Sequence, residues 1–211
     1  MAENYQLALD KELKRISLSP VRPRLLLHVC CAPCSSYVLE YLSSYFDITA
    51  CFYNPNISPK SEYDYRAQEL IRLTNEMPLA HPVGCQIEEY DSAPFTEMVK
   101  GLEKEPEGGA RCTLCYRLRL TETAKIAAAD GYDYFTTTLS ISPLKDAVRL
   151  NSIGAELAEM YGVPYLYSDF KKREGYKRSI QLSRTYDLYR QDYCGCAFSK
   201  AEAEQRKHNK I

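Results

Sequence analysis

The segment "RLLLHVCCAPCSSYVLEYLSSYF" (residues 24–46) decides how the chain folds. It opens with a short apolar run, which predicts a buried strand, and closes with the periodic apolar residues of a helix. Ser35 or Ser36 is the expected N-cap of that helix, because serine oxygens accept hydrogen bonds from the free N–H groups of a first turn. Between the two elements lie three cysteines: Cys30, Cys31 and Cys34.

The rest of the chain repeats this alternation of strand and helix. Further short apolar segments predict strands at 47–56, 81–90, 132–140 and 163–170. Helical patterns follow or separate them at 61–77, 92–104, 112–131 and 146–162. Such alternation predicts an α/β protein, a three-layer domain whose parallel sheet is covered by helices on both faces.

We expect one domain over residues 1–211, in three parts. They are an N-terminal extension (1–22), an α/β core (23–170) and a C-terminal section (171–211). The last section is rich in tyrosine and basic, with eleven Lys/Arg against five Asp/Glu, whereas the preceding residues have sixteen against twenty-three. A basic section on an otherwise acidic chain predicts a local anionic partner.

The composition predicts a reduced, cytoplasmic protein. A chain of 211 residues buries a core without needing disulfides. Its first twenty residues carry scattered charges and lack the apolar run of a signal peptide, and no stretch is apolar for long enough to cross a membrane. Nine cysteines in a reducing compartment therefore indicate metal or redox chemistry rather than structural bridges.

Seven of the cysteines form three groups. The first group ends the first predicted strand, at the carboxyl edge of the sheet, where open α/β sheets bind their ligands. The second is "CTLC", in which two cysteines three positions apart share one side of a helical turn. The third is "CGC", near the end of the chain. The members of the second and third groups are Cys112, Cys115, Cys194 and Cys196.

The other two cysteines, Cys51 and Cys85, stand alone inside apolar segments. A single buried cysteine usually acts as a small core side chain, and we predict that role for both.

Four thiolates hold either zinc or an iron–sulfur cluster. Structural zinc usually takes two CxxC-like turns, a geometry that the adjacent Cys30 and Cys31 suit poorly. A vicinal pair together with one CxxC offers four thiolates on a wider base, which favours a cluster. Zinc remains the alternative at this point.

Four motifs in order, "HVCCAPCSSYVLE", "CTLCYRLRL", "TTTLSISPLKD" and "LYRQDYCGC", resemble the QueH-type epoxyqueuosine reductases. The likeness runs from about Leu25 to Cys196. It implies the reductive removal of the epoxide oxygen from epoxyqueuosine in tRNA, which gives queuosine at the wobble position. It also implies a fold similar to the adenine nucleotide α-hydrolases (PP-loop enzymes, HUP). Those enzymes have a Gly-rich phosphate loop after the first strand, whereas this chain has Pro33 and no glycine there, so a metal site replaces the phosphate site.

The resemblance makes four cysteines the expected ligands of a 4Fe–4S cluster: Cys30, Cys31, Cys112 and Cys115. It leaves Cys194 and Cys196 as a redox-active pair. A disulfide across one glycine closes a small ring far from relaxed geometry, so it would be easily reduced, and Gly195 would supply the necessary backbone freedom. The alternative is that this pair binds an additional mononuclear metal ion, with Cys34 as a possible further ligand.

The C-terminal section predicts the RNA contacts. Basic residues interleaved with tyrosines suit phosphate contacts and base stacking. The predicted RNA-binding residues are Lys171, Lys172, Arg173, Lys177 and Arg178. The partners are therefore tRNA carrying epoxyqueuosine and an electron donor that the sequence does not identify.

Proton donors to the epoxide oxygen are sought among the side chains in or beside the motifs: Tyr116, Asp146, Asp192 and Tyr193. The sequence singles out none of them. Two other classes of protein remain open, a zinc-stabilised RNA-binding protein and a PP-loop ATP-dependent tRNA-modifying enzyme. The missing Gly-rich loop already argues against the second.

Overall fold

The computed structural model describes residues 4–208; residues 1–3 and 209–211, the outermost parts of the predicted extension and C-terminal section, lie outside them. The strands are β1 (Arg24–His28), β2 (Asp47–Phe52), β3 (Gly84–Ile87) and β4 (Tyr134–Thr137). The helices are α1 (Tyr5–Ser17), α2 (Ala32–Leu42), α3 (Lys60–Glu76), α4 (Ala93–Met98), α5 (Ala110–Ala129), the 3₁₀ helix η1 (Thr138–Ile141), α6 (Ala147–Tyr161), α7 (Gly175–Thr185) and α8 (Ala197–His208).

The four strands form one sheet in the order β3-β2-β1-β4, and every pair is parallel. β1 lies in the middle, and its side chains alternate between two hydrophobic layers. Leu25 and Leu27 pack with the residues of α2 and α3, while Leu26 packs with those of α5 and α6. The predicted α/β class and the parallel sheet are confirmed.

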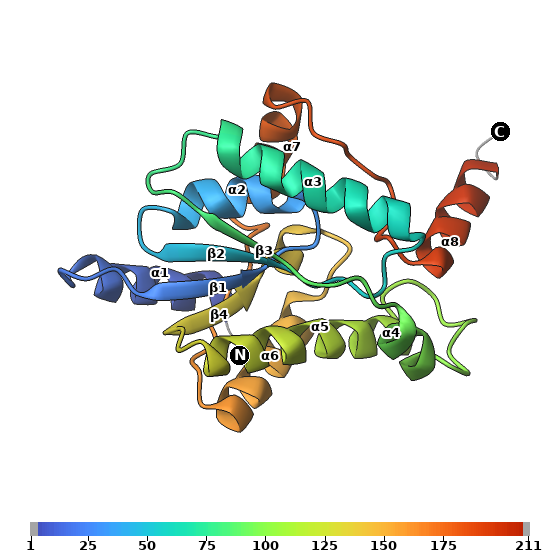
Figure 1. The fold of residues 1–211 in the computed structure, drawn as a ribbon, viewed down its shortest axis with the longest axis horizontal. Coiled ribbons are helices and arrows are strands. Elements are labelled where there is room, and N and C mark those ends of the chain that lie inside the picture. The colour runs from blue at the N-terminus through green and yellow to red at the C-terminus, as the bar shows by residue number, and fades with distance from the viewer. Residues whose placement is uncertain (1–3, 209–211) are drawn as a thin grey trace.

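Helices cover both faces of the sheet, as Figure 1 shows, with α2 and α3 above it and α5 and α6 below it. On the first face α1 adds Leu9, Leu13 and Ile16 to the same core cluster as β1 and α2. α7 packs against α2 on the outside of that layer. The arrangement is compatible with an adenine nucleotide α-hydrolase-like fold.

The predicted last strand, 163–170, is reduced to a single parallel bridge between Phe135 and Tyr165. Further along this segment, backbone groups that could have bonded to β4 form hydrogen bonds with side chains instead. The hydroxyl of Thr136 donates to the carbonyl of Leu166, and the N–H of Ser168 donates to the side chain of Asn151. The segment still lies beside β4 as a fifth position of the sheet.

This topology fixes where a ligand can bind. The next strand of the chain, β2, pairs with one edge of β1, and β4 pairs with the opposite edge. A crevice therefore opens beyond the carboxyl ends of β1 and β4, the place where open α/β sheets bind their ligands. The cysteines that follow β1 lie at this edge.

Within residues 4–208, none of the helices combines the length and the apolar character needed to cross a bilayer.

Candidate metal centre

Helix α2 begins earlier than the sequence predicted, inside the cysteine motif. Its N-cap is Cys31, in an extended conformation, and Pro33 lies in the first turn, where a missing N–H costs nothing. The expectation that Ser35 or Ser36 caps the helix is wrong. Both hydroxyls are buried and donate to carbonyls of the preceding turn.

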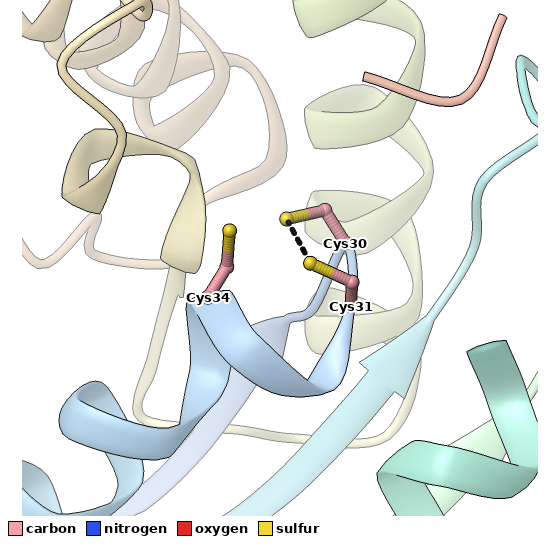
Figure 2. A group of neighbouring side chains, drawn as sticks. All are labelled: Cys30, Cys31 and Cys34. Carbon is pink, nitrogen blue, oxygen red and sulfur yellow. Dashed lines mark hydrogen bonds between the residues drawn. The ribbon is translucent and has the colours of Figure 1, made fainter. Parts of the chain in front are cut away.

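The three cysteines of this turn gather their sulfur atoms at one point. The Sγ atoms of Cys30, Cys31 and Cys34 all lie within 4.8 Å of one another, and those of Cys30 and Cys31 are 3.9 Å apart (Figure 2). Hydrogen bonds with the sulfurs of Cys31 and Cys34 hold the pKa of Cys30 well below the usual range of a thiol. The charge of Arg119 acts in the same direction. These three thiols form a group that could hold a metal ion.

Cys112 and Cys115 lie in the first turns of α5 and are both buried. The backbone N–H of Gly108 donates to Sγ of Cys112 at 3.2 Å. Burial raises the pKa of Cys112, and it raises that of Cys115 to about 12. Thiols with such values ionise when a metal binds and supplies the compensating charge.

The "CGC" segment is held against the same edge by backbone contacts. The N–H of Ser58 donates to the carbonyl of Gly195, and the guanidinium of Arg66 donates to the carbonyl of Cys194, both at 3.1 Å. Gly195 has a φ of +124°, and a Cβ atom there would lie 3.0 Å from Ile57, so glycine is required. The positive φ is compatible with the expectation that Gly195 supplies the backbone freedom for a disulfide, but both cysteines are free thiols here.

Two adjoining cavities bring the three cysteine groups together. The larger, of about 330 Å³, is lined by Cys30, Cys31, Cys34 and Cys194. The smaller is lined by Cys112, Cys115, Cys194 and Cys196. Cys194 lies on both, so the linings of the two cavities together include all seven clustered cysteines. All nine cysteines of the chain are free thiols in this structure.

A buried positive charge lies within this site. Arg119 is 1 % exposed, and its guanidinium donates to the carbonyl of Cys115 and to the side chain of Asn54. One of its nitrogens, Nη2, has no hydrogen-bond partner among residues 4–208, and no carboxylate there pairs with this arginine. Burial opposes its charge, but Cys115, Cys194 and Cys30 outweigh that effect and raise its pKa. The cysteines themselves are therefore the source of negative charge nearest to Arg119.

The histidine beside the cysteine motif is structural. His28 is fully buried, and burial lowers its pKa to about 3. Its Nε2 lies 3.2 Å from the carbonyl of Tyr53, which can only accept, and its Nδ1 lies 2.9 Å from the hydroxyl of Thr137. The neutral ring therefore donates through Nε2 and accepts through Nδ1.

The two isolated cysteines differ from each other. Cys51 is fully buried in the core, as predicted. The prediction for Cys85 is wrong: it is exposed on the edge strand β3, where its sulfur lies 3.2 Å from the hydroxyl of Thr74. The apolar residues around Cys85 did not indicate burial, because β3 is an edge strand that, within residues 4–208, pairs only with β2 and is open to solvent on its other side.

The larger cavity also contains a buried ion pair that the sequence analysis missed. Nζ of Lys145 lies 3.0 Å from Oε1 of Glu107. Both side chains line the cavity beside the cysteines. The signal that could have found the lysine is its place in the motif "TTTLSISPLKD", directly after β4 and η1.

Four of the five predicted RNA-binding residues form ion pairs within the protein. Their carboxylate partners are Asp169 for Lys171, Asp10 for Arg173, Glu174 for Lys177 and Glu40 for Arg178. Lys172 is exposed and has no ion pair within the described part of the chain. Closer to the cavity, Arg190 lies over the ring of Tyr176 at 5.6 Å, and it has no carboxylate partner among residues 4–208.

The chain is similar to proteins of known family. A sequence model of the family "Epoxyqueuosine reductase QueH" matches residues 25–202, which span all the clustered cysteines. The epoxyqueuosine reductase QueH of Staphylococcus epidermidis is 45% identical over 202 residues, which cover 93% of this chain and 84% of the relative. That of Streptococcus pyogenes is 44% identical over 93% of this chain and 78% of the relative. The Thermotoga maritima protein is 36% identical over 88% of this chain and 94% of the relative. The chain therefore belongs to the QueH family of epoxyqueuosine reductases.

Proposed function

We propose that this protein removes the epoxide oxygen from epoxyqueuosine in tRNA by a two-electron reduction that gives queuosine at the wobble position. The observation that carries the proposal is the match to the reductase family over the residues that build one seven-cysteine site. The adjoining cavity of about 330 Å³ is of the size that proteins use for small ligands and single nucleosides. A nucleoside in an anticodon loop reaches such a cavity when it is splayed out of its stack.

We propose a 4Fe–4S cluster on Cys30, Cys31, Cys112 and Cys115. The residues present fit this group in three respects. Their side chains are buried, they supply soft thiolate ligands, and two of them, Cys30 and Cys115, interact with Arg119, whose charge lacks a carboxylate partner within residues 4–208. A cluster held by four thiolates is a net anion and would compensate that charge. When bound, the cluster would transfer electrons one at a time.

The cysteines of "CGC" are proposed as a redox-active pair, whose oxidation to a disulfide would release two electrons. Cys194 lines the larger cavity, whereas Cys196 is buried and accepts a hydrogen bond from the N–H of Ser199 in the first turn of α8. The competing role is a second metal ion, for which Cys34 and Cys194 are close candidates on one cavity. We also place the protein in the cytoplasm, where tRNA and reduced thiols occur together.

The deciding experiment is metal and sulfide analysis of protein purified without oxygen, followed by turnover with tRNA that carries epoxyqueuosine. The proposal expects four or more iron atoms and four sulfides per chain, absorbance near 400 nm, and formation of queuosine when a reductant is supplied. One zinc per chain without sulfide would support a zinc-stabilised RNA-binding protein instead.

Arg119 provides a prediction about the reduction potential. Arg119→Met is expected to shift the potential of the cluster to more negative values, because a nearby cation stabilises the form that has gained an electron. A shift of about 60 mV corresponds to one order of magnitude in a one-electron equilibrium, and we expect at least that. Potentiometric titration measures it. Arg117→Met removes an exposed charge from the same helix and should leave the potential unchanged. An unshifted potential in Arg119→Met with full iron content would contradict the proposed counter-charge.

The RNA contact is proposed for the cations of the C-terminal section. Their expected contributions differ according to whether each cation is already paired with a carboxylate. A cation that must leave a carboxylate gains less from a phosphate than one that is free. Arg190→Gln and Lys172→Gln are each therefore expected to lower the slope of log K against log salt by about one, whereas Arg178→Gln is expected to lower it less, because Arg178 is paired with Glu40. Filter binding of tRNA measures the slopes. The salt concentration is varied from about 50 to about 200 mM, the range over which phosphate contacts lose affinity. Equal slopes in all four proteins, wild type included, would place the RNA elsewhere.

A further inference from the structure

The buried pair of Lys145 and Glu107 lies in the cavity proposed for the substrate. The two side chains are only 6 % and 10 % exposed. A buried charge pair is weak evidence for stability, because removing both charges from water is costly. Titratable groups that line a cavity in this way are candidates for a role in chemistry.

The surrounding chain holds the pair in place. Lys145 lies in the short loop between η1 and α6, where its backbone N–H donates to the carbonyl of Ser142. The N–H of Glu107 donates to Glu202 of α8 at 3.1 Å. The second carboxylate oxygen of Glu107 lies 3.8 Å from Arg206 and has no hydrogen-bond partner among residues 4–208. Contacts from α8 thus fix the glutamate, and the glutamate fixes the ammonium group beside Cys194.

We propose that Lys145 is the acid that protonates the epoxide oxygen, and that Glu107 is its positioning residue. This inference rests on the proposed function. As the first C–O bond breaks, an N–H bond of the ammonium breaks and its proton passes to the oxygen. Two electrons from the donor of the reductase and a second proton from solvent complete the loss of water and leave a C=C bond. The balance is one epoxide, two electrons and two protons to one alkene and one water.

Two arginines and two tyrosines near the cavity suit this role less well. Arg66 and Arg190 line the same cavity, but a guanidinium does not release its proton. The buried hydroxyl of Tyr116 lines the smaller cavity among the cysteines, not the larger one. Tyr193 lies against Arg66, whose guanidinium is 5.2 Å from its ring.

The charges around the ammonium set the expected pH dependence. Burial opposes the charge of Lys145, but Cys194, Tyr116 and Glu107 outweigh burial and raise its pKa. An acid works while it is protonated, so the rate should persist above neutral pH and fall only as the pH rises through this raised pKa. Removing the charge of Glu107 lowers the pKa and should move that fall to lower pH.

The first test separates proton donation from charge alone. Lys145→Gln and Lys145→Arg are each expected to lower the single-turnover rate by about 10²- to 10⁴-fold, the usual contribution of a positioned acid. Iron content and tRNA affinity should stay within twofold of the wild type. Arginine keeps the charge and the pairing with Glu107, so recovery of the rate in Lys145→Arg would overturn the assignment. Lys125→Gln, which removes an exposed lysine at the far end of α5, is the matched control and should keep the wild-type rate.

The second test is the pH profile of Glu107→Gln. The alkaline limb of its rate profile is expected at lower pH than in the wild type, a change that a purely structural role would not cause. An unmoved limb would overturn the inference, as would a wild-type rate in Lys145→Gln. A wild type that binds tRNA but never forms queuosine would instead refute the proposed function, so the two failures are distinguishable.

Discussion

Cys112→Ser and Cys115→Ser are each expected to leave less than about a tenth of the wild-type iron and no measurable reduction of epoxyqueuosine. The physical reason is that a serine hydroxyl is a poor substitute for a soft thiolate, and α5 offers no other cysteine within residues 110–129 to replace it. Iron and sulfide assays on protein purified without oxygen measure the first effect, and nucleoside analysis of treated tRNA measures the second.

The matched control is Cys51→Ser. Cys51 is also fully buried but lies in β2 among core side chains. Its replacement places a hydroxyl in an apolar site, so it should cost about 1–3 kcal/mol of stability while leaving the iron content intact. Retention of iron in both α5 variants would refute the proposed ligand set.

Cys194→Ser and Cys196→Ser are expected to stop turnover while iron stays near the wild-type level. As a redox pair these residues need not touch iron, yet neither can form the disulfide alone. Differential alkylation with peptide mapping provides the second measurement. After brief oxidation these two thiols should resist alkylation until a reductant is added, whereas the exposed Cys85 should remain reactive.

The second-metal model makes the opposite prediction. Loss of about one iron per chain in Cys194→Ser or Cys196→Ser, with four iron atoms remaining, would assign this pair to a metal ion. Thiols that stay reactive after oxidation would lead to the same conclusion. Cys34→Ser adds a third comparison, because its sulfur lies within 4.8 Å of those of Cys30 and Cys31.

Much of the fold could be predicted because its signals are local. The strand and helix periods of residues 24–46 predicted β1, α2 and the ligand edge between them, although the start of α2 was placed too late. Pro33 and the cysteines belong to the first turn, and no sequence rule distinguished the serines that cap a helix from those that donate inside one. The expected strand at 163–170 is reduced to one bridge because the next backbone groups, the carbonyl of Leu166 and the N–H of Ser168, bond to the side chains of Thr136 and Asn151.

The site was predictable in its cysteines and not in its charges. Cysteine groups are visible in sequence because their spacing is unusual. By contrast, Arg119 and Lys145 look like ordinary surface residues until the fold buries them beside the thiols. Likewise, the basic residues 171–178 looked like a free cationic surface, but two of them have carboxylate partners that are remote in sequence, Asp10 for Arg173 and Glu40 for Arg178. Such pairings depend on tertiary structure, which composition does not encode.

The cysteine groups that meet at one edge come from chain segments that start at residues 30, 112 and 194. Any group bound by Cys31 and Cys112 together would tie two points about 80 residues apart, which removes roughly 4–5 kcal/mol of conformational freedom from the denatured chain in the loop-entropy treatment. The bound group would then act as a cross-link for the whole sheet. Oxidative loss of that group should therefore lower the melting temperature of the entire protein as well as abolish its chemistry.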